Sequence, residues 1–354
     1  MHYNITEQET VINVYSNITK YVTESGYDDI INVAFFINKY YLWVILVIGF
    51  PGNMATIVTI TRARSFGSFT LYVILLAFVD NLAILVKTVV YQLNQNQVNI
   101  AVAGCRILYF LGNFLATFAN WILVLMAVER LVAVRYPLKI KKYLNSKTSS
   151  FAVFLVGAVI AGAYSPILWV FSFNEKYRLC EFSRKTSVFK LLLIVYWTNI
   201  SLFAFIPFLV LAMCNLLIVL VIRKSFRIRH SMGETYSQTS NKQTNYYVSV
   251  QRQIMLMLFT STLVFVVFLF PLCAFHVANA SWQVTPLTRA YAAKYLMNQL
   301  AYLLCDSTHA VNFYVYFLSA RKFRCHFLQM MTCSVASSRE MSLLNGYWKR
   351  SIQT

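Results

Sequence analysis

The chain has 354 residues, of which 58% are hydrophobic and only 12% are charged. Soluble domains carry about 25% charged residues, so the composition argues against an ordinary soluble protein. The formal net charge of +19 could indicate nucleic-acid binding, but its placement along the chain argues against nucleic acid as a partner.

Seven long apolar stretches, separated by polar connections, run along the chain. A helix needs about 20 mostly apolar residues to cross a bilayer, and backbone groups in hydrocarbon must be bonded within their own segment. The stretches cover residues 41–61, 69–90, 107–128, 151–173, 191–222, 254–278 and 295–318. The sequence therefore predicts an all-α membrane protein, a seven-transmembrane helix bundle in the lipid bilayer.

Three parts are expected along the chain. Residues 1–36 form an extracellular disordered head, residues 37–331 the membrane domain and residues 332–354 a cytoplasmic tail. After the last stretch, apolar and basic residues alternate at helical spacing, as they do in a helix that lies on a membrane surface. We therefore expect a short amphipathic helix after span seven, with an ordinary basic flank as the alternative.

The orientation follows from the basic residues. With the N-terminus outside, the segments facing the cytoplasm hold 20 of the 31 Lys and Arg residues, which agrees with the positive-inside rule. Three Asn-X-Ser/Thr sequons, at Asn4, Asn17 and Asn279, then fall on the outer side and are candidates for glycosylation. We expect a multi-pass plasma-membrane protein with an extracellular N-terminus.

The cysteines divide between the two sides of the membrane. Cys105 and Cys180 both lie on the outer, oxidising side, where we expect them to form a disulfide, with two free thiols as the alternative. Cys325 and Cys333 follow the last span on the inner side, where palmitoylation and an unmodified thiol are both open.

Polar residues inside the spans are costly and point to function. Asp80 lies near the bilayer centre, with Asn53 and Asn312 at similar depth in other spans. These three residues are expected to form a polar core that can hold water or a cation. The alternative is a satisfied structural network between helices.

An ion pair is expected between the polar core and the outer face of the membrane. Lys87 lies seven residues after Asp80, about 10 Å outward, and Asp306 lies six residues before Asn312, about 9 Å outward. Lys87 and Asp306 are therefore level, and we predict that they pair. The pair could act as a structural latch or as part of a ligand floor.

Glu129 and Arg130 lie at the inner end of span three. Glu129 can hold the guanidinium at rest, and a partner protein can bind Arg130 when the helices part. The alternative is that this Glu-Arg pair is an ordinary charged pair at the membrane–water interface, without a functional role.

At these positions the chain resembles a rhodopsin-like (class A) G protein-coupled receptor. The resemblance covers residues 37–331 and lies in the joint spacing of its motifs. The matching residues are Gly52, Asn53, Asp80, Cys105 (25 residues before Arg130), Glu129, Arg130, Cys180, Pro207, Pro271, Asn312, Tyr316 and Phe323.

The chain departs from the usual family pattern at several positions. Leu269 stands where span six usually has Trp, Phe313 where span seven has Pro, and Leu131 where an aromatic residue follows Arg130. Ala119 and Asn215 replace a common Ser and a common Tyr. With these departures, the chain is similar to invertebrate neuropeptide receptors of the FMRFamide-receptor-like kind.

The resemblance implies a receptor and not an enzyme, with no cofactor. It implies that Glu129, Arg130 and Tyr316 serve activation and coupling to a heterotrimeric G protein. Arrestin and a receptor kinase are the further partners that it implies.

The ligand class follows by elimination within the family. Asp306 stands where an opsin carries its retinal lysine, and Gly112 stands where amine receptors carry an aspartate. An extracellular peptide is therefore expected, with a non-peptide small molecule as the alternative and a multi-span transporter as a remote one. The candidate ligand-binding residues are Lys87, Tyr91, Gln92, Tyr109, Asn113, His276, Gln299, Tyr302 and Asp306.

Overall fold

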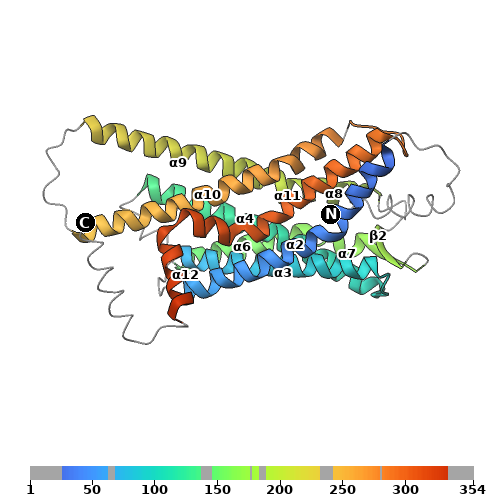
Figure 1. Cartoon of the computed structure of the whole chain (residues 1–354), viewed down its shortest axis with the longest axis horizontal. Coiled ribbons are helices and arrows are strands. Elements are labelled where there is room, and N and C mark those ends of the chain that lie inside the picture. Colours follow the sequence, from blue (N-terminus) through green and yellow to red (C-terminus); the bar gives the residue numbers. More distant parts are fainter. Residues whose placement is uncertain are drawn as a thin grey trace.

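Long helices lie side by side along one axis in the computed structural model (Figure 1). A two-stranded hairpin lies at one end of the bundle, and a short helix, α12, turns across the other end. We call these ends the hairpin end and the α12 end. The structure describes residues 26–62, 68–136, 146–175, 178–182, 189–231, 242–279 and 281–333.

Helices cover six of the seven predicted apolar stretches, and several extend beyond them. The fourth stretch, predicted to residue 173, has a turn at residues 165–166 and is helical only to residue 170. The elements, in chain order, are α2 Tyr27–Arg62, α3 Ser68–Gln95, α4 Ala101–Arg135, α6 Ser146–Tyr164, α7 Ile167–Val170, β1 Phe171–Asn174, β2 Leu179–Phe182, α8 Phe189–Ile200, the π-helix η2 Ser201–Phe205, α9 Ile206–Ser231, α10 Lys242–Asn279, α11 Arg289–Ser319 and α12 Arg321–Cys333.

The expected disordered head is wrong over its last ten residues, because α2 already begins at Tyr27. Tyr27, Ile31 and Ala34 recur at helical spacing and are buried against Ala292 and Tyr295 of α11. Burial of this apolar face stabilises the early helical turns. The proposed glycosylation sites Asn4 and Asn17 lie outside the described residues.

Six helices in the described ranges are long and apolar enough to cross a membrane, judged by length and composition. They correspond to the first six predicted spans. The seventh, α11, has 31 residues but is less apolar than the others. Its buried face carries several polar side chains, namely Asn298, Gln299, Asp306, His309 and Asn312. A helix that turns its polar side chains toward the bundle interior can still present an apolar surface to lipid.

Helix α4 lies at the centre of the bundle, in contact with α3, α6, α9 and α10. Many of its side chains are buried along its whole length, from Cys105 near the hairpin end to Arg130 near the α12 end. Helix α4 therefore runs through the bundle interior from one end to the other.

The hairpin is tied to the start of α4. Strands β1 and β2 pair in antiparallel register, with Phe173 opposite Cys180. Cys180 forms a disulfide with Cys105, so the bridge, and not the alternative of two free thiols, is present. The Arg106 Nε donates to the Phe171 carbonyl at 3.1 Å, which adds a second link between α4 and β1.

The predicted helix after span seven is present as α12. Its buried Phe323 packs against Phe313 and Tyr316, with ring centroids 5.9 Å apart in both pairs. This contact fixes α12 to the end of α11. Cys325 is a half-buried free thiol, and its palmitoylation stays a prediction, as does that of Cys333, whose side chain lies outside the described part.

Candidate functional site

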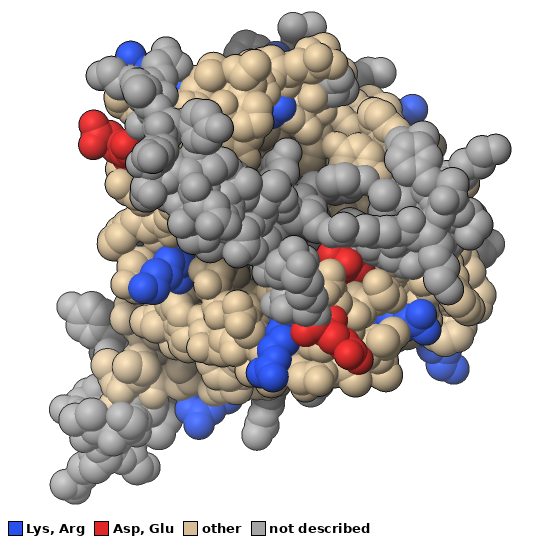
Figure 2. Space-filling model, turned by 90° about the vertical axis from the view of Figure 1, so that its right-hand side faces the viewer, with Lys and Arg blue, Asp and Glu red and all other residues tan. Residues whose placement is uncertain are grey.

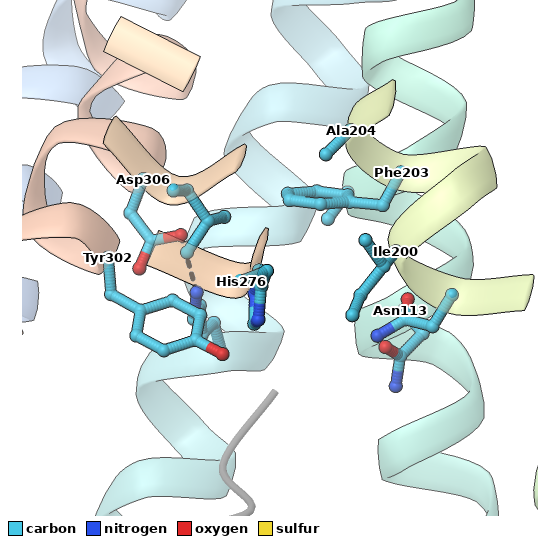
Figure 3. A pocket seen from close by; sticks show the side chains of 11 residues that line it. Asn113, Ile200, Phe203, Ala204, His276, Tyr302 and Asp306 are labelled. Atoms are coloured by element: carbon cyan, nitrogen blue, oxygen red, sulfur yellow. Dashed lines mark hydrogen bonds and ion pairs between the residues drawn. The ribbon is translucent and has the colours of Figure 1, made fainter. Parts of the chain in front are cut away.

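A cavity lies inside the bundle between α3, α4, α8, η2, α10 and α11 (Figure 3). Its volume of about 30 Å³ is enough for a few atoms of a ligand or a few water molecules. Five of the nine candidate ligand-binding residues line it, namely Lys87, Asn113, His276, Tyr302 and Asp306. Figure 3 shows Tyr302 and Asp306 across the cavity from Asn113, with His276 between them.

The other four candidates do not line this cavity. Tyr91 is buried in an apolar cluster between α2, α3 and α11, and Gln92 is the next residue along α3. The Tyr109 ring stacks on Phe171 at 4.3 Å, so it anchors the hairpin. Gln299 is fully buried, and its amide has no hydrogen-bond partner among the described residues.

The predicted pair of Lys87 and Asp306 is confirmed. The Lys87 ammonium donates to Asp306 Oδ1, and the Tyr41 hydroxyl donates to Asp306 Oδ2 at 3.2 Å. The same ammonium lies 5.8 Å from the centroid of the Tyr302 ring. Both charges are therefore neutralised at the cavity wall. Sequence reasoning missed Tyr41, because nothing in the spacing of residues shows which side chains of α2 face α11.

A second, smaller cavity of about 10 Å³ adjoins this ion pair. Lys87, Asp306 and Ala116 line both cavities, and His309 lines the smaller one. The space is enough for about one water molecule. The ion pair therefore separates the larger cavity from the polar core described next.

Asp80 is the centre of the polar core. Its Oδ2 accepts from Asn312 Nδ2 at 2.8 Å, and its Oδ1 lies 2.7 Å from His309 Nδ1. Asn53, the third member of the expected polar core, does not bond to this carboxylate directly. Asn53 Nδ2 donates instead to Asn81 Oδ1 at 3.0 Å and to the His309 carbonyl at 2.9 Å.

The core is thus a network of α2, α3 and α11, extended to α10 by the Ser261 hydroxyl, which donates to Asn312 Oδ1 at 3.2 Å. His309 is a further member of this network beside Asp80, and the binding of water or a cation there stays a prediction. His309 stood out as an ionisable residue in span seven, but Asn81 and Ser261 gave no signal that distinguishes them from other polar residues in spans.

The predicted coupling residues lie together at the α12 end. Arg130 Nη2 lies 3.5 Å from Glu129 Oε1, and the Ser149 hydroxyl of α6 donates to Glu129 Oε2 at 3.3 Å. Both charged side chains are buried, as is Tyr316. In this arrangement Arg130 is paired with Glu129, and the Tyr316 side chain is buried.

The π-helix η2 is held to α4 by two side chains. Asn120 Nδ2 donates to the Phe203 carbonyl at 2.8 Å, and Trp121 Nε1 donates to the Leu202 carbonyl at 2.9 Å. A π-helix disturbs the usual i to i−4 hydrogen-bond ladder, so these donors satisfy carbonyls in the disturbed region. An asparagine within the apolar stretch of α4 was the only sequence signal for this contact.

Comparison with known proteins identifies the class of this molecule. Residues 52–316 match the family described as 7 transmembrane receptor (rhodopsin family). The chain therefore belongs to the rhodopsin family of seven-transmembrane receptors. It is a receptor and a multi-pass membrane protein, not an enzyme, and the transporter alternative is wrong.

Among known proteins, the chain is similar to growth hormone secretagogue receptor type 1. It is 24% identical to the receptor of Homo sapiens over 322 residues, which cover 85% of this chain and 82% of that receptor. It is also 24% identical to the receptors of Mus musculus and Rattus norvegicus, each over 321 residues and with the same coverage of both chains. The finer likeness to FMRFamide-receptor-like proteins stays a prediction, since these relatives carry another name.

Proposed function

We propose that the chain is a plasma-membrane receptor that binds an extracellular peptide at the hairpin end and activates a heterotrimeric G protein at the α12 end. One observation carries the proposal. The single helix α11 contributes to all three polar levels of the bundle. Tyr302 and Asp306 line the cavity, and His309 and Asn312 contact Asp80. Tyr316, further along the same helix, lies at the α12 end. A rigid helix with buried contacts at all three levels can couple ligand binding to a distant surface.

The orientation has independent support. A disulfide at the hairpin end persists on the oxidising side of a membrane. Asn279, a glycosylation candidate, ends α10 at this same end of the bundle.

Figure 2 shows the hairpin end with both acidic and basic side chains on it, and the exposed ones include Asp28, Asp29, Arg178 and Arg289. A surface with both signs suits a peptide with mixed charges.

The size of the cavity supports a peptide that inserts one end. About 30 Å³ accommodates only a small chemical group, so most of a larger ligand would lie outside it, toward the hairpin. Since Tyr109 stacks on Phe171, the hairpin is fixed over the start of α4 and can support the rest of the ligand. A non-peptide ligand of similar length would use the same geometry, and the experiment below separates the two.

The proposed mechanism is a shift between two states. In the described state Glu129 lies beside Arg130, and Tyr316 is buried against Phe323. Ligand binding stabilises a second state in which α9 and α10 move away from α4 at the α12 end. Arg130 and Tyr316 then become accessible to the G protein. The ligand contributes only the difference between its affinities for the two states.

Further partners and modifications remain part of the proposal. Arrestin and a receptor kinase would bind the same activated end and the tail, and the tail beyond residue 333 lies outside the described residues. The basic and apolar faces of α12 would lie against the inner leaflet.

The test is nucleotide exchange on purified heterotrimeric G proteins, added to membranes that contain the full chain. Pools of synthetic peptides are expected to stimulate exchange, and Arg130→Ala is expected to abolish the stimulation. Arg135→Ala, at the exposed end of the same helix, is the matched control and should keep it. If only non-peptide compounds stimulate exchange, the ligand class is wrong. Stimulation that survives Arg130→Ala would contradict the role of this residue.

A further inference from the structure

Two adjacent hydroxyl residues of α10 bond in different directions. The Ser261 hydroxyl donates to Asn312 Oδ1 of α11 at 3.2 Å, and the Thr262 hydroxyl donates to Asn215 Oδ1 of α9 at 2.9 Å. Adjacent side chains of a helix project about 100° apart, so a single turn of α10 can reach both neighbours. Both hydroxyl side chains are buried. Hydrogen bonds therefore join α9, α10 and α11 at one level of the bundle.

The two acceptors differ in what holds them. Asn312 is fixed to the polar core, because its Nδ2 donates to Asp80 Oδ2 at 2.8 Å. It therefore stays with α3 and α11 when α10 moves. Asn215 is the one amide or hydroxyl side chain in residues 206–222 of α9, which are otherwise apolar. Its bond to α10 thus supplies a directional contact that the apolar surface of α9 does not.

Helices α9 and α10 contact each other at two levels. Thr262 has a second acceptor within reach, the Phe259 carbonyl of its own helix at 3.1 Å, but Asn215 Oδ1 is the nearer of the two. About two turns further toward the hairpin end, Phe208 of α9 lies beside Phe270 of α10, with ring centroids 6.4 Å apart. A polar contact and an aromatic contact therefore connect these two helices.

We propose that Ser261 is a positioning residue that holds α10 to Asn312 in the described state, and that Thr262 ties α9 to α10 so that both helices move as one unit. This inference rests on the proposed function and adds the two contacts that control the movement. When α10 leaves α4 at the α12 end, the Ser261 bond must break, because Asn312 stays with Asp80. The Thr262 bond persists, because both of its partners move. A neutral hydrogen bond contributes little net free energy, so a ligand can readily offset the loss of one.

Spin labels at three exposed positions follow the helices without any ligand. Arg135→Cys of α4, Arg223→Cys of α9 and Leu256→Cys of α10 carry the labels, in a chain with Cys325→Ser and Cys333→Ser. Electron paramagnetic resonance measures the distance from α4 to α10 and the distance from α4 to α9 in lipid nanodiscs.

Ser261→Ala is expected to lengthen both distances, because the described state loses the bond that holds α10. In the double variant Ser261→Ala, Thr262→Val only the distance from α4 to α10 should lengthen, because α9 is no longer tied to α10. Ser261→Thr keeps the hydroxyl and should keep both wild-type distances. Unchanged distances in Ser261→Ala would overturn the role of Ser261. A double variant in which α9 still follows α10 would overturn the role of Thr262.

Nucleotide exchange gives a readout that a purely structural role does not change. Ser261→Ala is expected to raise exchange without ligand about two- to tenfold, the population shift that one neutral hydrogen bond gives. Thr260→Val is the matched control and should keep the wild-type rate, because the Thr260 hydroxyl donates to the Leu256 carbonyl of its own helix at 2.8 Å. A lower thermal midpoint for Ser261→Ala, with unchanged distances and exchange, would overturn the inference. Longer distances without faster exchange would support the inference and contradict the proposed coupling to G protein.

Discussion

The Lys87–Asp306 pair is a buried contact between two charged residues whose contribution to stability can be tested directly. Both side chains are largely buried, and each charge has the other as its main compensation. Breaking a buried pair by removing one partner leaves an uncompensated charge, which costs about 3–5 kcal/mol, whereas replacing both partners with apolar residues is often nearly neutral.

We therefore predict that Lys87→Met lowers the free energy of unfolding by about 3–5 kcal/mol. The double variant Lys87→Met, Asp306→Leu should lose less than the single one, because no charge is then left buried. Thermal unfolding of the purified receptor measures both. The single variant Asp306→Leu completes the comparison. If the loss of unfolding free energy in the double variant equals the sum of the losses in the two single variants, the two residues do not act as a pair.

The sequence predicted this pair because depth along two helices can be counted from Asp80 and Asn312. It did not predict His309 as the partner of Asp80, or Asn81 as the partner of Asn53. These contacts depend on how each helix is rotated about its axis, which residue spacing alone does not determine. For the same reason Gln299 was expected at the ligand and is found buried outside the cavity.

At the scale of elements, α2 and α11 approach each other closely at Gly49. A Cβ at this position would lie 2.8 Å from the Ala310 Cβ and 2.9 Å from the Ile84 Cδ1. The absence of a side chain thus lets α2 contact α3 and α11 at once. Phe313, where the family usually has proline, allows α11 to continue as one helix past this contact.

Gly49→Ala is expected to destabilise the receptor by about 1–3 kcal/mol, because the added methyl group overpacks the α2–α11 contact. Gly162→Ala is the matched control, since a Cβ there meets nothing within 4 Å. That control should be neutral or stabilise by up to about 1 kcal/mol, the usual gain for alanine over glycine in a helix. Equal thermal midpoints for the two variants would contradict the close approach.

The π-helix η2 supports a second prediction at this scale. Trp121→Phe removes the donor to the Leu202 carbonyl in a part-buried hydrogen bond and should lower the free energy of unfolding by about 1 kcal/mol, the usual net contribution of such a bond. Trp169→Phe is the control, because Trp169 is 64% exposed. Thermal unfolding of both variants is the measurement, and an unchanged midpoint for Trp121→Phe would show that η2 does not depend on this bond.

At the scale of the whole molecule, the number of spans, the disulfide and the helix after span seven could all be predicted. Apolar length, the positions of Cys105 and Cys180, and the alternation after residue 320 carried these predictions. The start of α2 at Tyr27 could not, because it depends on tertiary packing against α11. The cavity itself is likewise a property of the assembled helices and has no local signal.

The central claim is that the cavity and the α12 end are coupled through the bundle, and thermodynamic linkage tests it directly. If a peptide favours the state that binds G protein, then G protein must raise peptide affinity by the same factor, typically about 5- to 150-fold. The measurement is the affinity of the most potent peptide for the receptor in lipid nanodiscs, with and without nucleotide-free G protein. We predict tighter binding with G protein for the wild-type chain and no change for Arg130→Ala. Identical affinities with and without G protein in the wild-type chain would contradict the account.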